Sequence, residues 1–220
     1  MKSPKKTLIT NFSALTVVQL ANYILPLVIL PYLVRVIGPA KFGVLAFAQA
    51  VVFYFTLLPD FGINLYAPRE IALLKEDQKA LSAIVSGVLL IKALFLCASL
   101  VLYIAVVAVV PRFRDESLVF ILSAGYMIAN SFLPTWFFQG IEKMVNITMG
   151  LLVARILSLV LIFSFIREKG DYVWVPLINS GGLMAGVLLM YVLMFYREDI
   201  KLMLPSKVQL RKILRESIPL

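Results

Sequence analysis

Apolar residues fill six long runs of this chain, and the breaks between the runs carry turn residues or charges. The runs cover about 10–34, 42–66, 81–110, 118–139, 146–166 and 173–196. Each run is long enough to cross a bilayer as a helix, for which about 20 residues suffice. The breaks hold Gly38-Pro39, Pro68 to Lys79, Pro111 to Glu116, Gly140 to Lys143 and Arg167 to Asp171. The pattern predicts an all-α, multi-pass transmembrane bundle of six helices.

Composition strengthens the membrane interpretation. Of the 220 residues, 61% are hydrophobic and 15% are charged, whereas soluble domains are about 45–50% apolar and about 25% charged. The chain has no His, and its single cysteine, Cys97, lies inside an apolar run. We therefore expect no His-based metal site, no catalytic triad and no cofactor. The predicted loops are too short to hold a soluble catalytic domain, so we do not expect an enzyme.

The distribution of Lys and Arg predicts the orientation of the helices. Thirteen lie at the N-terminus, in the second and fourth gaps and after the sixth run, whereas six lie in the remaining gaps. Because cytoplasmic segments carry the excess of Lys and Arg, both ends of the chain should be cytoplasmic. The net charge of +9 is explained by these gaps, so we do not expect nucleic acid as a partner. Only Lys92 and Arg155 lie within predicted helices.

The segment after the sixth run is predicted to be a basic linker. We divide the chain into a six-helix lobe at 1–196, a cytoplasmic amphipathic linker at 197–216 and the start of a seventh span at 217–220. In the linker, Ser206 is a candidate N-cap, and Leu210, Ile213 and Leu214 share one helical face. Such a helix should lie on the inner membrane surface. We expect the chain to be the front part of a longer protein.

Polar side chains recur at helical spacing within the runs, so that each run has a polar face. One interpretation is a water-filled cavity, and the other is hydrogen bonding between helices. The polar positions are Thr16, Gln19, Asn22 and Tyr23; Gln49, Thr56 and Asp60; Lys92, Ser99 and Tyr103; Ser123, Tyr126 and Asn130; and Thr148, Arg155 and Ser158.

Lys92 and Arg155 are the most informative of these positions. A charge at the centre of a membrane helix costs about 2.5–3.5 kcal/mol even on a lenient scale. Either cation could therefore face a cavity as part of a binding site, or it could form a structural pair for which Asp60 is the candidate counter-ion.

Two further motifs predict packing rather than chemistry. Gly182 and Gly186 form a small-xxx-small pair that favours close approach of two helices. Trp136, Phe137 and Phe138 are interpreted as an aromatic belt at the membrane interface.

Four stretches resemble the Wzx-type polysaccharide flippases, the polysaccharide branch of the multidrug/oligosaccharidyl-lipid/polysaccharide exporter superfamily. They are LVRVIGPAKFG (33–43), DFGINLYAPREIA (60–72), PTWFFQGIEKM (134–144) and VPLINS (175–180). The motif residues that carry the likeness include Arg35, Gly38, Gly43, Arg69, Glu70, Trp136, Gln139, Gly140 and Glu142.

The resemblance implies a function and partners. Two six-helix lobes would face each other across a cavity, and this chain would supply the first lobe. The substrate would be an undecaprenyl-diphosphate-linked oligosaccharide that crosses the inner membrane during O-antigen or other surface polysaccharide synthesis. Membrane lipid, the C-terminal lobe and polysaccharide polymerase would be the partners. A multidrug or other small-molecule antiporter of the same superfamily is the alternative, and a non-transporting scaffold for assembly enzymes is a third hypothesis.

Residue roles follow from combining this resemblance with the polar positions. Lys92 and Arg155 would bind the diphosphate. Gln19, Asn22, Gln49 and Asn130 would bind sugar hydroxyls, and Asp60 would be an ion-coupling carboxylate or a counter-ion. The motif residues Arg35, Arg69 and Glu142 lie at helix ends, where they would hold neighbouring helices or headgroups.

Overall fold

A computed structural model describes the backbone of residues 4–217 and the side chains of residues 16, 19, 20 and 23–217. Within that range the chain is helical and contains no strand, which confirms the predicted all-α bundle. The helices are α1 (Pro4–Ile37), α2 (Pro39–Asp60), α3 (Ile63–Leu74), α4 (Gln78–Val109), α5 (Pro111–Arg114), α6 (Ser117–Ser131), α7 (Thr135–Gly140), α8 (Met144–Phe165), the 3₁₀ helix η1 (Lys169–Trp174), α9 (Val175–Arg197) and α10 (Lys207–Ser217).

Five stretches of the described chain are long and apolar enough to span a membrane. They are Pro39–Asp60, Gln78–Val109, Ser117–Gly140, Met144–Phe165 and Lys169–Arg197, and Tyr23–Ile37 forms a shorter apolar helix within α1. These stretches overlap the six predicted runs in the same order along the chain.

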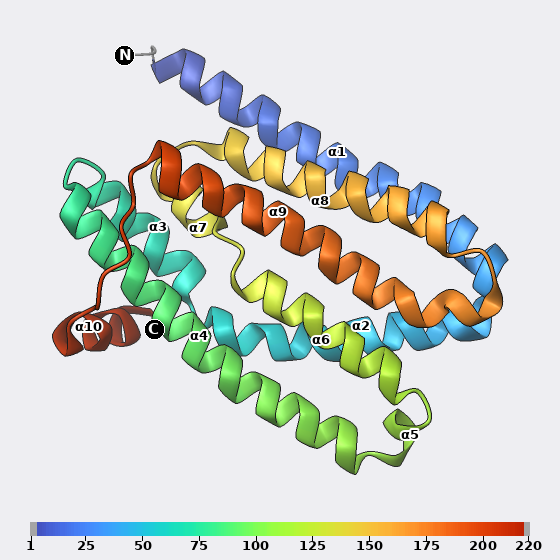
Figure 1. The fold of residues 1–220 in the computed structure, drawn as a ribbon. Helices are drawn as coiled ribbons and strands as arrows, with labels where there is room; N and C mark the ends of the chain where they lie inside the picture. Colours follow the sequence, from blue (N-terminus) through green and yellow to red (C-terminus); the bar gives the residue numbers. More distant parts are fainter. Residues whose placement is uncertain (1–3, 218–220) are drawn as a thin grey trace.

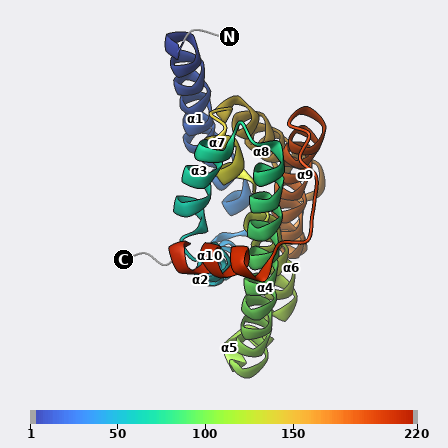
Figure 2. The same ribbon diagram turned by 90° about the vertical axis from the view of Figure 1, so that its left-hand side faces the viewer.

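The long helices lie side by side in an order that differs from their order in the chain. α1 packs on α8, α8 on α9, α9 on α6, α6 on α2 and α2 on α4 (Figure 1). The short helices α3 and α7 pack on each other at the end of the bundle where α4 begins and α9 ends. α10 lies across α3 and α4 (Figure 2).

Two predicted runs are interrupted in the structure. The run 42–66 was predicted as one helix, but α2 ends at Asp60 and α3 begins at Ile63. The intervening Phe61 and Gly62 have φ angles of 21° and 72°, and glycine supplies such positive φ without steric cost. The run 118–139 is divided between α6 and α7 just before Thr135, where Pro134 cannot donate a backbone hydrogen bond.

The predicted aromatic belt is wrong. Trp136, Phe137 and Phe138 are all 0% exposed and belong to a core formed with α3, α4 and the end of α9. The break before Thr135 starts a new short helix, and α7 packs this aromatic cluster on α3. At the end of α7, a Cβ on Gly140 would collide with the side chain of Ile71 and lie 2.9 Å from the carbonyl oxygen of Pro68. The aromatic residues therefore fasten α7 to α3 instead of facing lipid headgroups.

The glycine pair of α9 produces the predicted close packing. A Cβ on Gly182 would collide with the side chain of Ser158 on α8, and a Cβ on Gly186 would collide with the carbonyl oxygen of Gly150. α8 and α9 consequently form the most extensive contact between two helices of the described chain. This contact sets the spacing of the helices beside the cavity described below.

Candidate functional site

A cavity of about 360 Å³ lies among α2, α6, α8 and α9, the helices that form the middle of the bundle. Ten described residues line it: Gln49, Tyr126, Asn130, Leu133, Leu151, Ala154, Arg155, Ser158, Asn179 and Leu183. The structure thus brings together Gln49, Asn130 and Arg155, three of the six residues predicted to bind substrate. They come from three helices that are far apart in the sequence.

Helical periodicity explains why these side chains converge. Tyr126 and Asn130 are four residues apart on α6, and Asn179 and Leu183 are four residues apart on α9. Residues at this spacing lie one above the other on a helix. The close approach of α8 and α9 at Gly182 and Gly186 then holds Arg155 beside these two faces.

Arg155 is the single charged residue among the described lining residues. Its side chain is exposed, and none of the lining residues that the structure describes is a carboxylate that would neutralise it. A guanidinium presents five donors in a planar fork, which matches phosphate or carboxylate oxygens. The surrounding amides of Gln49, Asn130 and Asn179 both donate and accept hydrogen bonds, as the recognition of hydroxyl groups requires. The arrangement suits a ligand that is anionic at one point and polar elsewhere.

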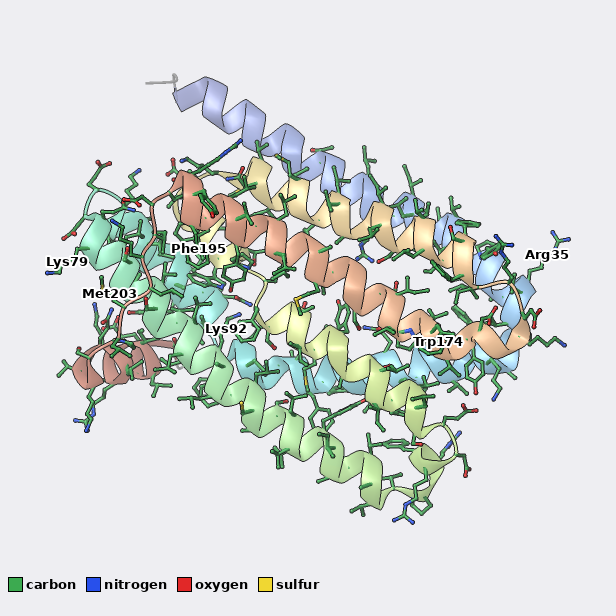
Figure 3. The ribbon with its side chains drawn as sticks, in the orientation of Figure 1. Arg35, Lys79, Lys92, Trp174, Phe195 and Met203 are labelled. Carbon is green, nitrogen blue, oxygen red and sulfur yellow. The ribbon has the colours of Figure 1, made fainter. Side chains whose placement is uncertain are left out.

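Lys92 lies outside this cavity and is 1% exposed. Its Nζ donates to Oδ1 of Asp60 at 2.8 Å and to Oδ1 of Asn64 at 3.4 Å. Lys92 therefore lies on α4 against the break between α2 and α3 (Figure 3). Of the two alternatives for this lysine, the structure contains the pair with Asp60. Direct contact between Lys92 and substrate stays a prediction. Such contact would require the hydrogen bond between Lys92 and Asp60 to break.

Ser99 and Tyr103, the other polar residues on the same face of α4 as Lys92, are also buried between helices. The Ser99 hydroxyl donates to the carbonyl oxygen of Phe55 at 2.6 Å, and the Tyr103 hydroxyl donates to that of Phe120 at 2.6 Å. Both side chains are no more than 1% exposed. On α4, the polar stripe therefore joins α2 and α6 rather than facing water.

The predicted α1 residues do not line the cavity. Gln19 is exposed and donates to the hydroxyl of Tyr23 at 2.9 Å. The side chain of Asn22 lies outside the described residues. The roles of Gln19 and Asn22 in sugar binding stay predictions.

The motif residues of the resemblance lie mainly at helix ends. Gly38 has φ 82° and turns the chain from α1 into α2. Arg35, three residues earlier, is exposed in the last turn of α1 (Figure 3). Gly43 has open space where a Cβ would lie. Glu142, with φ 59°, follows the buried α7 motif. Gly38 and Glu142 therefore shape turns, and none of these four residues lines the cavity.

Three further motif residues, Arg69, Glu70 and Gln139, lie on α3 and α7, at the end of the bundle opposite Gly38. Glu70 pairs with Lys212 of α10 at 3.1 Å, whereas Arg69 and Gln139 are exposed. The hydrogen bond from Lys212 to Glu70 raises the pKa of the Lys212 ammonium group. The Glu70 carboxylate therefore holds α10 against α3.

Three functional candidates were missing from the predicted set. Tyr126 and Asn179 line the cavity, and Asn64 is the second acceptor for Lys92. Tyr126 shares a helical face with Asn130, and Asn179 is an amide within an otherwise apolar run, so both carried a sequence signal. Asn64 carried none, because its partner is set by the break between α2 and α3.

A polar cluster lies at the end of the bundle opposite α10. Lys41 Nζ lies 2.6 Å from Oε1 of Glu116 and 3.1 Å from the hydroxyl of Tyr172, which itself donates to Glu116 Oε2 at 2.6 Å. Burial acts to raise the pKa of Glu116, but the hydrogen bonds from Lys41 and Tyr172 outweigh it and lower that pKa. The cluster ties α2, the start of α6 and η1 together, and it lies away from the cavity.

Comparison with known proteins shows that the sequence is similar to proteins of polysaccharide biosynthesis. A family model described as "Polysaccharide biosynthesis protein" matches residues 8–220. A protein of Escherichia coli (strain K12) named "Putative O-antigen transporter" is 31% identical over 189 residues, which are 86% of this chain and 46% of the relative. A Shigella dysenteriae protein of the same name is 30% identical over 185 residues, 83% of this chain and 46% of the relative. The chain therefore spans about half the length of these curated relatives. No solved structure matches it.

Proposed function

The chain belongs to the polysaccharide biosynthesis protein family, and we propose that it forms one lobe of a transporter for lipid-linked oligosaccharides. The substrate would be an oligosaccharide repeat unit on undecaprenyl diphosphate, moved across the bacterial inner membrane for O-antigen or other surface polysaccharide synthesis. The names of the two relatives support a polysaccharide substrate over the drug substrates of a multidrug antiporter. A C-terminal lobe would complete the transporter.

The observation that carries this proposal is the cavity with Arg155 as its one cation among the described lining residues. A diphosphate carries about two negative charges, and an arginine can bind it through two parallel charge-assisted hydrogen bonds. Sugar hydroxyls would bind Gln49, Asn130 and Asn179, which lie around the same cavity. The lipid tail would stay in the bilayer, because transferring it into a polar cavity would forfeit its apolar burial.

Lys92 and Asp60 have a supporting role in this proposal. Asp60 acts as the counter-ion of Lys92, with Oδ1 of Asp60 2.8 Å from Nζ of Lys92, and the pair holds α4 against the break between α2 and α3.

Polymerase and other assembly proteins would receive the repeat unit after transport.

The test is substitution of Arg155 in the full-length protein, expressed in a cell that lacks its own transporter. Arg155→Gln removes the charge but keeps a polar side chain, so we expect transport to fall roughly ten- to hundredfold, since hydrogen bonds to charged groups contribute about 1.5–3 kcal/mol. Surface polysaccharide is measured by gel and by antibody binding. Arg155→Lys should retain part of the activity.

Arg114→Gln is the matched control, because it removes one arginine from α5, outside the cavity lining. Membrane levels of each variant are measured by immunoblot. Normal surface polysaccharide in the Arg155→Gln cells would refute the proposed role of the cavity.

A further inference from the structure

The segment that follows α9 is held along α4 by side chains of α4 itself. Residues 198–206, here named the strap, run from the end of α9 to α10 (Figure 1). Ser82 Oγ accepts from the backbone N–H of Lys201 at 3.2 Å, and Ser86 Oγ accepts from that of Met203 at 3.0 Å. Gln78 donates to the carbonyl oxygen of Glu198. The strap is thus a fixed part of this end of the bundle, where Figure 3 shows Met203 and Lys79.

α10 is docked as well, and it begins as predicted. Ser206 Oγ accepts from the backbone N–H of Gln209 at 3.2 Å, which is the geometry of an N-cap. Ile213 is 0% exposed, and its side chain fills the space above Gly87, where a Cβ would collide with it. The pair between Lys212 and Glu70 joins the same helix to α3. The apolar residues Leu210 and Ile213, which the sequence assigned to the membrane surface, therefore pack against the protein.

A different set of apolar side chains is exposed on the strap and α10. Leu202 is 64% exposed, Leu204 99% and Val208 80%. Exposed cations lie among them in the sequence: Lys201, Lys207, Arg211 and Arg215. Residues 197–217 contain six Lys or Arg and three acidic residues. Of those acidic residues, Glu198 is paired with Lys143 at 2.6 Å and Asp199 with Lys201 at 3.7 Å. The surface is therefore basic and carries protruding apolar groups.

This surface lies beside the point where α4 begins to expose apolar side chains. α10 crosses α4 (Figure 2), and its Ile213 side chain lies against Gly87 of α4. Leu90 and Leu94, one and two turns further along α4, are exposed apolar residues on a helix that is long enough to span a membrane. The strap and α10 thus lie next to the level at which α4 begins to present apolar side chains outward.

We propose that the strap and α10 form a binding surface for anionic phospholipid at the membrane interface. Leu202, Leu204 and Val208 insert among the upper parts of the acyl chains, and Lys207, Arg211 and Arg215 contact headgroup phosphates. Exposed apolar side chains beside clustered cations are the combination that binds anionic membranes. Because the segment is already docked on α3 and α4, binding does not require it to fold. The proposal is independent of the transported substrate.

Spin labels at two exposed positions test this surface. Leu204→Cys and Val208→Cys are made separately in the full-length protein with Cys97→Ser, and each is reconstituted in phosphatidylcholine vesicles with or without phosphatidylglycerol. Collision rates with oxygen and with a water-soluble nickel chelate report the depth of each label. In vesicles that contain phosphatidylglycerol, we expect the collision rate of each label with oxygen to exceed its collision rate with the chelate. We expect this difference in rates to shrink at high salt.

A charge-neutralised variant provides the matched comparison. Lys207→Gln, Arg211→Gln and Arg215→Gln together should abolish the dependence on phosphatidylglycerol, whereas Arg112→Gln, Arg114→Gln and Arg167→Gln together should leave it intact. Thermal unfolding verifies that both triple variants are folded. Labels that meet the chelate equally in both lipids would overturn the proposal. Labels shielded from both reagents would overturn it too, because they would show that protein, such as the rest of the chain or a second copy, covers this surface.

Discussion

At the residue scale, the two cations within the helices have different environments. Arg155 is exposed in a cavity whose other described lining residues are neutral, whereas Lys92 is 1% exposed and hydrogen-bonded to Asp60. Asp60 is the more accessible partner, with 29% of its side chain exposed. The two members of the pair should therefore respond differently to removal of the other, because an unpaired charge costs more when it is more deeply buried.

We predict an asymmetric result for the Lys92–Asp60 pair. Asp60→Leu leaves the fully buried ammonium group without its carboxylate and should destabilise the protein by about 3–5 kcal/mol, the usual cost of breaking a buried pair. Lys92→Met leaves a carboxylate that water can reach, so its cost should be smaller. The double variant should recover most of the loss. Thermal unfolding of the full-length protein in detergent measures all three.

Lys79→Met is the control for this series, since Lys79 is an exposed residue near the start of the same helix. Its unfolding midpoint should match the parent protein. Equal losses in both single variants, with no recovery in the double, would contradict the assigned pairing.

At the scale of elements, the contact between α8 and α9 determines the shape of the cavity. Gly182 and Gly186 of α9 meet Ser158 and Gly150 of α8 with no room for a Cβ. Arg155 and Ala154 of α8 line the cavity next to Asn179 of α9. A change in the spacing of these two helices should therefore alter the cavity as well as the stability.

Two glycines on α9 allow a matched test of this packing. Gly186→Ala should destabilise the protein by about 1–3 kcal/mol, the usual range for overpacking, because the new Cβ would meet a backbone oxygen of α8. Gly181→Ala lies on the same helix with no atom within 4 Å of its Cβ, so it should be neutral or stabilise by about 0.5–1 kcal/mol. Unfolding midpoints in detergent measure the difference. A Gly186→Ala protein as stable as Gly181→Ala would contradict the close contact.

At the scale of the whole molecule, the two ends of the bundle differ in charge. Lys79 and α10 lie at the end where α4 begins, and Arg35 and Trp174 of η1 lie at the other end (Figure 3). Lys143 belongs to the first end, because it pairs with Glu198 directly after α9. In the topology predicted from the sequence, 13 Lys or Arg belong to the first side and six to the second. We therefore propose that the end with α10 is cytoplasmic.

Cysteine labelling tests this orientation. Single cysteines replace Glu76, in the turn before α4, or Gly170, in η1, with Cys97→Ser in both proteins. We expect a membrane-impermeant maleimide to label Gly170→Cys in intact cells and to label Glu76→Cys only after permeabilisation. The reverse pattern would contradict the positive-inside assignment. Labelling after detergent solubilisation provides the control for reactivity.

Much of the fold could be predicted from local patterns. The apolar runs located the spanning helices, Gly182 and Gly186 indicated close packing, and Ser206 indicated the start of α10. The aromatic belt was assigned wrongly, because a row such as Trp136, Phe137 and Phe138 has the same composition in a core as at an interface. Only the packing of α7 on α3 distinguishes the two cases.

The sequence by itself determined the membrane class, the order of the helices along the chain and the polar residue types available for a site. These properties follow from hydropathy and from the periodicity of a single helix, which are local. Tertiary structure alone decided that Gln49, Asn130 and Arg155 share a cavity, that Lys92 pairs with Asp60, and that α10 buries Ile213 while Leu204 is exposed. Each of these depends on which helices become neighbours, and side-chain periodicity within one helix carries no information about the partner that it meets.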